Sequence, residues 1–382
     1  MRKRNYYILL FVCLLCVFQS AVSVTARPLI GGVESSASEE DTVVGETSEL
    51  MVQYQEYEQR FAAIEERSDI VENGFDIIKY HEIPVVFETF GEEEVTFILA
   101  LDRQYARMVI FIADKQGTIL YKTNQLETNN RCLGEMKQPT KGSVAISFQD
   151  VNKDGLTDII MITNCENSTG DYAGKSYKIG DVLFQGEKTF YRDYRISDKL
   201  NRFSMNKSIA CIVAYVRDGI STEVLYTAST LKELTDQNFK IIQEQCYWRD
   251  FEKQGRLQVV PGVMCIAEYN IFMIYLVNEQ GNIVWSFQPM GDYANLYSLK
   301  GMTGRDMDGD GMKDLVVLAR YSNEGPDGKP IVESDCAIYY QRTTGFDVDT
   351  EFKKFYKCTE EDTLEKLVKK IRKYWGWPQD ND

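Results

Sequence analysis

Two short runs of the chain combine acidic side chains with a glycine in the same order. Both follow the pattern Asp-x-Asp/Asn-x-Asp-Gly-x-x-Asp. The polar side chains of this pattern are Asp150, Asn152, Asp154 and Asp158 in the first run and Asp306, Asp308, Asp310 and Asp314 in the second. Oxygen atoms at alternate positions converge on one hard cation as the chain curls around it, and the glycine, Gly155 or Gly311, permits the sharp turn.

The same pattern supplies the remaining ligands of a cation. The residue after the glycine, Leu156 or Met312, can offer its backbone carbonyl, and the aspartate at the ninth position closes the shell. A shell of about seven oxygens without an imidazole or a thiolate selects Ca²⁺ over transition metals. We therefore predict two Ca²⁺ sites. We expect the ion to be structural, because a shell of protein oxygens leaves little room for a substrate.

The residues that follow each run exclude an EF-hand. An EF-hand needs a bidentate glutamate at position twelve and then a helix, whereas position twelve is Met161 in the first run and Val317 in the second. The surrounding stretches, Ile159–Ile162 and Leu315–Leu318, are apolar and typical of buried strands.

A calcium loop that runs directly into a buried strand resembles the FG-GAP/VCBS repeat family, which forms β-propeller blades in integrin α-subunits and many secreted bacterial proteins. The resemblance is carried by FQDVNKDGLTDIIMI (148–162) and GRDMDGDGMKDLVVL (304–318). It implies a propeller stiffened by calcium, in which the eight polar side chains of the two runs are ligands. Only four or five blade-like units are recognisable in this chain, so the number of blades and the closure of the ring stay open.

Catalytic chemistry is harder to recognise. The chain lacks a G-x-S-x-G motif, a phosphate-binding loop and a dinucleotide fingerprint. Its single histidine, His81, excludes metal centres that need two imidazoles, and beside Glu82 we interpret it as a surface or packing residue. Polysaccharide cleavage by tyrosine and aspartate stays open, because such residues have no recognisable spacing.

The elements that position the two runs are predicted to be strands. Short Val-, Ile-, Tyr- and Phe-rich runs alternate with Gly, Asn and Asp turns, which predicts an all-β fold. The fold is internally duplicated: Val109–Tyr121 aligns with Met273–Trp285 at an offset of 164, and Asp150–Ile162 with Asp306–Leu318 at an offset of 156. We therefore predict a β-propeller-like body.

The boundaries of this body follow from the pattern. The predicted halves are residues 69–204, with the loop 150–158, and residues 205–358, with the loop 306–314. An N-terminal helix is expected over 49–68, and a C-terminal helix and tail over 359–382. Between the halves, the β-branched residues and the Arg217-Asp218-Gly219 turn of 208–228 favour a two-stranded hairpin.

The N-terminus has the pattern of an export signal. Basic residues, an apolar run and small residues fill positions 1–26, as in a cleaved signal peptide, although an uncleaved anchor is the alternative. The small, acidic residues 27–48 are expected to form a disordered linker. We therefore expect a secreted or extracellular protein, with no stable membrane span after signal cleavage.

The net charge and the cysteines limit which partners, metals and cross-links the chain is expected to have. The net charge of −15 becomes −18 without residues 1–26, which repels phosphate backbones and argues against nucleic acid. Seven of the nine cysteines lie beyond the signal: Cys132, Cys165, Cys211, Cys246, Cys265, Cys336 and Cys358. Their wide spacing argues against zinc and allows one or two disulfides, with Cys132–Cys165 weakly favoured.

These features together predict a secreted or cell-surface calcium-binding protein that acts as a ligand-binding or adhesion module for an extracellular protein or glycan. The alternative is a calcium-stabilised carbohydrate-active enzyme on the same scaffold, a polysaccharide lyase or hydrolase.

Overall fold

The computed structural model describes residues 53–129, 136–137, 144–167, 176–291, 294–324 and 329–377. The expected signal peptide and linker lie outside these ranges, as does Cys132 of the favoured disulfide. The chain is mostly β, with 45% strand and 24% helix, and its four antiparallel sheets do not close on themselves within the described ranges.

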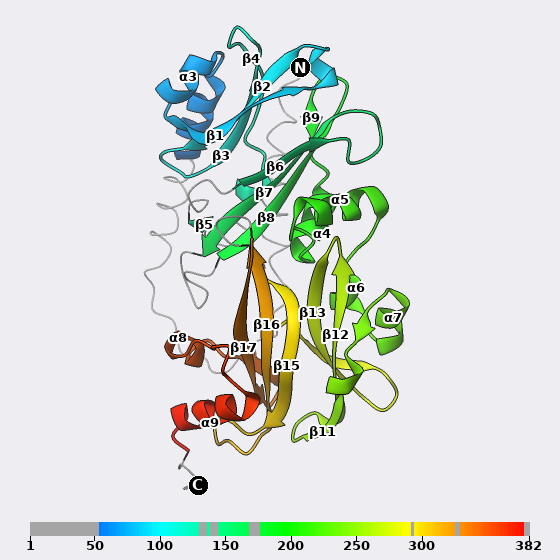
Figure 1. The fold of residues 1–382 in the computed structure, drawn as a ribbon. Helices are drawn as coiled ribbons and strands as arrows, with labels where there is room; N and C mark the ends of the chain where they lie inside the picture. The colour runs from blue at the N-terminus through cyan, green and yellow to red at the C-terminus, as the bar shows by residue number, and fades with distance from the viewer. Residues whose placement is uncertain are drawn as a thin grey trace, which may run out of the picture.

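The N-terminal part of the chain forms the first two sheets (Figure 1). The first sheet contains, in spatial order, β1 (Phe75–Val86), β2 (Glu94–Asp102), β3 (Met108–Ala113) and β4 (Ile119–Thr123). The second sheet contains β5 (Met136–Lys137), β7 (Asp158–Asn167), β8 (Ser176–Gln185) and β9 (Phe190–Tyr191), with β6 (Val144–Gln149) also paired to β7.

The C-terminal part forms the other two sheets. The third contains β10 (Lys240–Ile241), β12 (Gly255–Ile266), β13 (Tyr269–Val277) and β14 (Ile283–Phe287), with β11 (Tyr247–Phe251) also paired to β12. The fourth contains β15 (Asn295–Arg305), β16 (Asp314–Glu324), β17 (Pro330–Arg342) and β18 (Gly345–Val348).

The sheets pack in two pairs. Phe97 and Ile110 of the first sheet share a buried apolar cluster with Leu183 of the second. In the same way, Phe287 of the third sheet packs on Tyr339 of the fourth, with ring centroids 4.5 Å apart. Each pair therefore buries the apolar residues of its two inner faces as a sandwich.

Helices cover the outer faces of the sheets. A helix over 53–62 and α3 (Arg67–Glu72) cover the first sheet. The other sheets are covered by α4 (Tyr194–Arg202), α5 (Ile209–Asp218), α6 (Val224–Thr227), α7 (Leu231–Asp236), α8 (Phe352–Phe355) and α9 (Leu364–Tyr374). Short 3₁₀ helices occupy Glu88–Phe90, Glu127–Asn129 and Gln243–Gln245.

The hairpin predicted between the halves is wrong, because α5 and α6 occupy this segment. Ser208 caps α5 by accepting a hydrogen bond from the amide of Cys211, and Gly219 ends it in the left-handed conformation at φ 68°. Ile212 faces the second sheet, whereas Cys211 faces the third. Two apolar faces therefore outweigh the low helix propensity of β-branched residues.

The β3–β4 and β13–β14 hairpins share their turn geometry. Gly117 and Gly281 have φ 96° and 83°, and each amide donates to the carbonyl of the residue three positions earlier, Asp114 or Asn278. A register shift lies at corresponding points of the two hairpins. The described helices include none that is long and apolar enough to cross a membrane.

The packing of the third sheet on the fourth makes Phe287 a test of the sandwich. We expect Phe287→Ala to lower the free energy of unfolding by about 3–5 kcal/mol, because it leaves a cavity between the sheets. Val284→Ala, on the same strand but 40% exposed, is the matched control and should cost less than about 1 kcal/mol. Urea denaturation measures both variants. Equal costs would contradict the assigned core.

Candidate metal centre

The two predicted calcium loops are tight connections between antiparallel strands. The first joins β6 to β7, where Gln149 pairs with Asp158, and the second joins β15 to β16, where Arg305 pairs with Asp314. The glycine at position six is left-handed in both, with φ 87° at Gly155 and 84° at Gly311. Each loop thus runs directly into a buried strand, in the β arrangement that the sequence predicted.

Position four is left-handed as well. It is Lys153 in the first loop, with φ 66°, and Gly309 in the second, with φ 86°. A lysine pays a steric penalty for this conformation that a glycine avoids. Both loops are left-handed at positions four and six, and Gly309 and Gly311 of the second loop adopt this conformation without the steric penalty.

The carboxylates at positions one and five accept hydrogen bonds from the loop backbone. Asp150 Oδ2 accepts from the amide of Gly155, and Asp306 Oδ2 from that of Gly311, both at 2.9 Å. Asp154 Oδ1 accepts from Leu156, and Asp310 Oδ1 from Met312, at 2.9 and 2.8 Å. Leu156 and Met312 are the residues predicted to contribute carbonyl ligands. Their amides thus hold the carboxylates at position five.

The ninth-position aspartates are buried. Asp158 accepts from the amides of Val151 and Gln185, both at 2.8 Å. Asp314 accepts from Met307 at 2.7 Å and Gln341 at 2.8 Å. Each carboxylate therefore ties the second residue of its loop to a neighbouring strand, β8 or β17.

Burial raises the pKa of both ninth-position aspartates. Desolvation is the main cause for Asp158, which also lies near Asp154 and Asp150. For Asp314, desolvation and the nearby charges of Asp308 and Asp310 raise the pKa from 3.8 to about 7, against the lowering effect of two amide donors. Negative charge is therefore costly at this position unless a cation offsets it.

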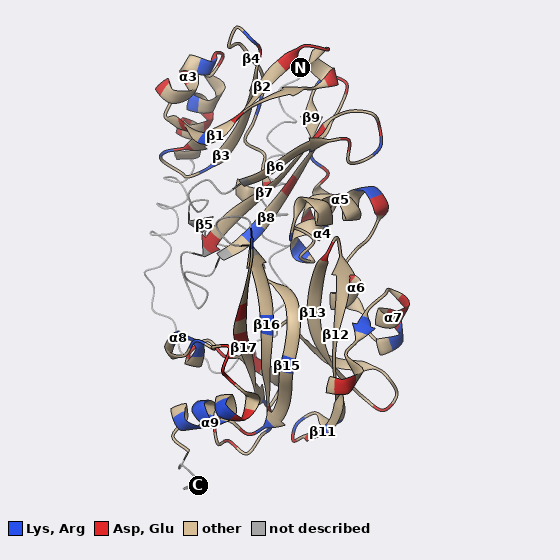
Figure 2. Cartoon of the chain, in the orientation of Figure 1, with Lys and Arg blue, Asp and Glu red and all other residues tan. Residues whose placement is uncertain are grey.

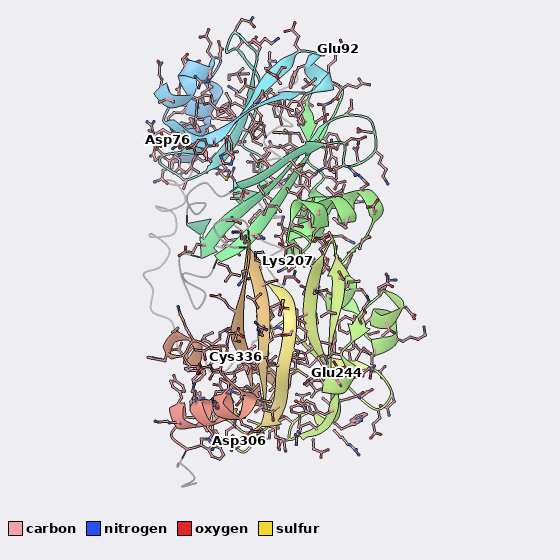
Figure 3. The ribbon with its side chains drawn as sticks, viewed as in Figure 1. Asp76, Glu92, Lys207, Glu244, Asp306 and Cys336 are labelled. Atoms are coloured by element: carbon pink, nitrogen blue, oxygen red, sulfur yellow. The ribbon has the colours of Figure 1, made fainter. Side chains whose placement is uncertain are left out.

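The second loop brings its acidic ligands closest together. Oxygens of Asp306, Asp308 and Asp314 all lie within 4.8 Å of one another at the α9 end of the fourth sheet, where Figure 3 labels Asp306. In the first loop, Asn152 takes the place of Asp308, and its amide nitrogen donates to Asp154 Oδ2 at 2.8 Å. An oxygen-only cluster of this kind fits a hard cation such as Ca²⁺.

An arginine already serves as counter-charge in the second loop. Arg342 Nη1 lies 2.9 Å from Asp308 and 3.1 Å from Asp310. The guanidinium thus stabilises the carboxylates at positions three and five, and it competes with any cation for them.

Three supporting residues in each half were missed by sequence reasoning. The first two are a glutamate and a glutamine. The amide of Thr157 and the side chain of Gln185 donate to Glu88 Oε2, at 2.9 and 2.8 Å. Lys313 and Gln341 donate to Glu252 Oε2 in the same manner, at 2.8 and 3.1 Å. These contacts fasten position eight of each loop.

The third supporting residue is an arginine on the helix that follows each loop-bearing sheet. Arg217 of α5 donates to the carbonyl of Asp150 at 2.5 Å. Arg372 of α9 donates to the carbonyl of Asp306 through Nε and Nη2, at 3.0 and 2.9 Å. The first residue of each loop is therefore held from outside its sheet.

Comparison with known proteins adds little. No family model matches the chain, and no curated protein matches it. Among solved structures, an exo-inulinase from Aspergillus awamori is similar at 13% identity with a TM-score of 0.21. The match covers 67% of this chain and 47% of that chain, so this chain spans about half the length of the exo-inulinase. A TM-score this low does not indicate a shared fold.

The raised pKa of Asp314 predicts a pH effect on stability in the presence of a chelator. Between pH 3.8 and about 7, the folded chain keeps a proton on Asp314 that the unfolded chain has lost. The free energy of unfolding should therefore fall as pH rises through this window.

Urea denaturation at a series of pH values checks this expectation. Asp314→Asn should make the fall shallower, whereas Asp236→Asn, whose side chain is 57% exposed on α7, should not change it. The same pH profile in the wild type and Asp314→Asn would exclude Asp314 as the titrating group.

Proposed function

We propose that this chain is an exported protein in which one Ca²⁺ ion stiffens each half, bound by the loops 150–158 and 306–314. The observation that carries the proposal is the recurrence of one arrangement in both halves. A buried ninth-position aspartate, a glutamate–glutamine pair and a helical arginine support each loop. Ordinary acidic turns have no need of such shared support.

The donor set fits a calcium ion. In the second loop the side chains of Asp306, Asp308, Asp310 and Asp314 would hold it, with the carbonyl of Met312. In the first loop Asp150, Asn152, Asp154, Asp158 and the carbonyl of Leu156 would do so. A bound divalent cation would offset the clustered negative charge, which includes the desolvated carboxylates of Asp158 and Asp314.

The internal duplication is part of the same proposal. The corresponding hairpins and supporting glutamates recur at an offset of 164 residues, the loops and glutamines at 156, and the helical arginines at 155. We propose a relationship to the FG-GAP/VCBS repeats, because each sheet is an antiparallel meander of the kind found in propeller blades. The described sheets pack as two sandwiches with helices on their outer faces, so any such blades are arranged in pairs.

The role of the stiffened body would be to bind an extracellular protein or glycan. Exposed aromatic rings on both halves suit this role, since Tyr80, Tyr194 and Tyr297 are 83%, 63% and 60% exposed. A glycan and protein array, probed with and without Ca²⁺, tests it. Release of sugar from a bound glycan would instead indicate the carbohydrate-active enzyme.

Calcium titration distinguishes the two loops. We expect the loop 306–314 to bind more tightly, because it has four carboxylates where the first has three. Isothermal titration of Asp310→Ala should show loss of the tighter site, and that of Asp154→Ala loss of the weaker site, each by about tenfold or more in affinity.

Calcium should also raise the melting temperature, because it binds the folded state alone. Asp236→Ala, a change to an exposed aspartate on α7 that pairs with Lys232, is the control and should keep both sites. Equal loss from both loop variants would contradict the ranking. A melting temperature unaffected by a chelator would contradict the calcium sites themselves.

Arg342 should oppose calcium in the second loop. We expect Arg342→Gln to raise the affinity of that site by roughly threefold to tenfold, because it removes a positive charge within 3.1 Å of Asp308 and Asp310. Arg320→Gln is the matched control, since Arg320 is equally exposed and pairs with Glu360 instead. A lower affinity in Arg342→Gln, measured by calorimetry, would show that the guanidinium organises the loop.

A further inference from the structure

Two cysteines meet between the fourth sheet and the segment that leads to α9. Cys336 lies on β17 and is buried, and Cys358 follows α8 and is partly buried. Both are free thiols in the structure. Their Sγ atoms and a carboxylate oxygen of Asp335 all lie within 4.8 Å of one another. The two sulfurs therefore need to approach by at most about 2.8 Å to reach the length of a disulfide bond.

A metal ion is a poor occupant of this position. The third group, Asp335, is already engaged, because Lys353 Nζ lies 2.7 Å from its Oδ2 and the amide of Cys336 donates to its Oδ1 at 2.8 Å. The lysine would also repel a cation. His81, the single histidine, lies on β1 in the other half. Two thiolates without a third available ligand do not make a zinc site.

The environment favours thiol chemistry at Cys358. A hydrogen bond from Cys336 lowers the pKa of the Cys358 thiol, and the positive charge of Lys353 acts in the same direction. The same hydrogen bond, together with burial, raises the pKa of Cys336. Cys358 is therefore the thiol that more readily forms the attacking thiolate.

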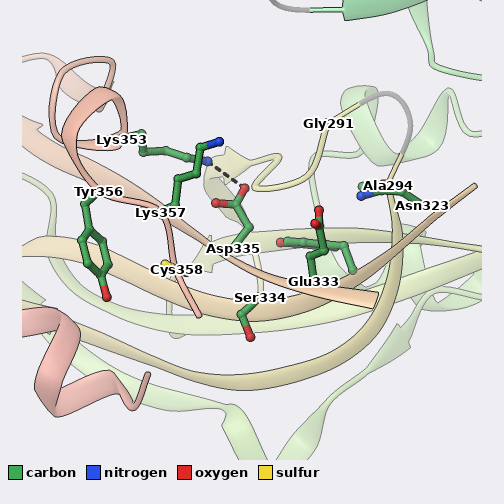
Figure 4. Close-up of a pocket in the computed structure, with 11 residues that line it drawn as sticks. Gly291, Ala294, Asn323, Glu333, Ser334, Asp335, Lys353, Tyr356, Lys357 and Cys358 are labelled. Atoms are coloured by element: carbon green, nitrogen blue, oxygen red, sulfur yellow. Dashed lines mark hydrogen bonds and ion pairs between the residues drawn. The ribbon is translucent and has the colours of Figure 1, made fainter. Parts of the chain in front are cut away.

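A pocket gives access to Cys358. It has a volume of about 470 Å³, and Figure 4 shows Cys358 on its wall with Asp335, Lys353, Tyr356 and Lys357. The dashed line in that view is the Lys353–Asp335 ion pair. A small disulfide-containing oxidant can reach the Cys358 sulfur from this side.

We propose that Cys336 and Cys358 form a disulfide bond in the exported protein. The Cys358 thiolate attacks one sulfur of a disulfide oxidant, which forms a mixed disulfide and releases one thiol of the oxidant. Cys336 then loses its proton and attacks the Cys358 sulfur, which releases the second thiol. The chain loses two protons and two electrons, and the oxidant is reduced to two thiols.

The bond would fasten the C-terminal segment to the fourth sheet. It closes a loop over the 21 residues between the cysteines, which contain β18 and α8. It also anchors the chain shortly before α9, whose Leu367, Val368 and Ile371 pack on the outer face of that sheet. Cross-linking should stabilise this region mainly by restricting the unfolded chain.

Peptide mapping of the full chain tests the proposal. For this test the protein is expressed with export to an oxidising compartment, purified without reductant, alkylated and digested with trypsin. We expect residues 321–342 to remain linked to residues 358–366. Protein made in a reducing compartment should gain the same link when it is incubated with glutathione disulfide. Alkylation of both Cys336 and Cys358 in the exported protein, with or without bound zinc, would overturn the proposal.

Thermal melting gives a second readout. The oxidised protein should melt roughly 5–10 °C higher than the reduced protein. The double variant Cys336→Ser/Cys358→Ser should lose this response to reductant, whereas Cys265→Ser, at an exposed cysteine on β12, should keep it. Retention of the full response in the double variant would contradict the proposal. If that variant does not fold, peptide mapping of the wild type still decides.

Discussion

The buried carboxylates of Asp158 and Asp314 are the groups on which the surrounding structure depends. A carboxylate removed from water is tolerated only where donors surround it. Each receives one amide from the second residue of its own loop and one from the adjacent strand, at 2.7–2.8 Å. These bonds set the curvature of the loop and fasten it to β8 or β17. The same requirement explains why the supporting contacts come from several elements at once.

Those contacts recur with different surrounding residues. Position eight is Thr157 in one half and Lys313 in the other, yet both amides donate to a glutamate that also accepts from a glutamine side chain. What recurs is thus the pattern of donors and acceptors, while the exposed residues vary. The second loop adds Arg342, which gives it a counter-charge of its own.

The local pattern of the loops could be predicted from the sequence, because ligand spacing, glycine position and the apolar run that follows are short-range features. Glu88 and Glu252 could also have been found, since they are separated by the same offset of 164 residues. The sequence could not predict which sheets pack on each other. Alternation of apolar and polar residues shows which face of a strand is buried, but it does not show which sheet covers that face. The sequence of α5 contains two signals of a helix, a capping serine at Ser208 and a terminating glycine at Gly219. The hairpin prediction is wrong because it follows the β-branched residues of this segment instead.

The two helices that hold the loops differ in their surroundings. Through Arg217 and Arg372, α5 and α9 make the same contact with their loops, but α5 is also covered on its other side by the third sheet. The outer side of α9 carries lysines, and Figure 2 shows this gathering of positive charge. A helix with two apolar faces can lie between two sheets, whereas a helix with one apolar face leaves its other side to solvent. In these terms α5 is a spacer between the second and third sheets, and α9 is an amphipathic cover on the fourth.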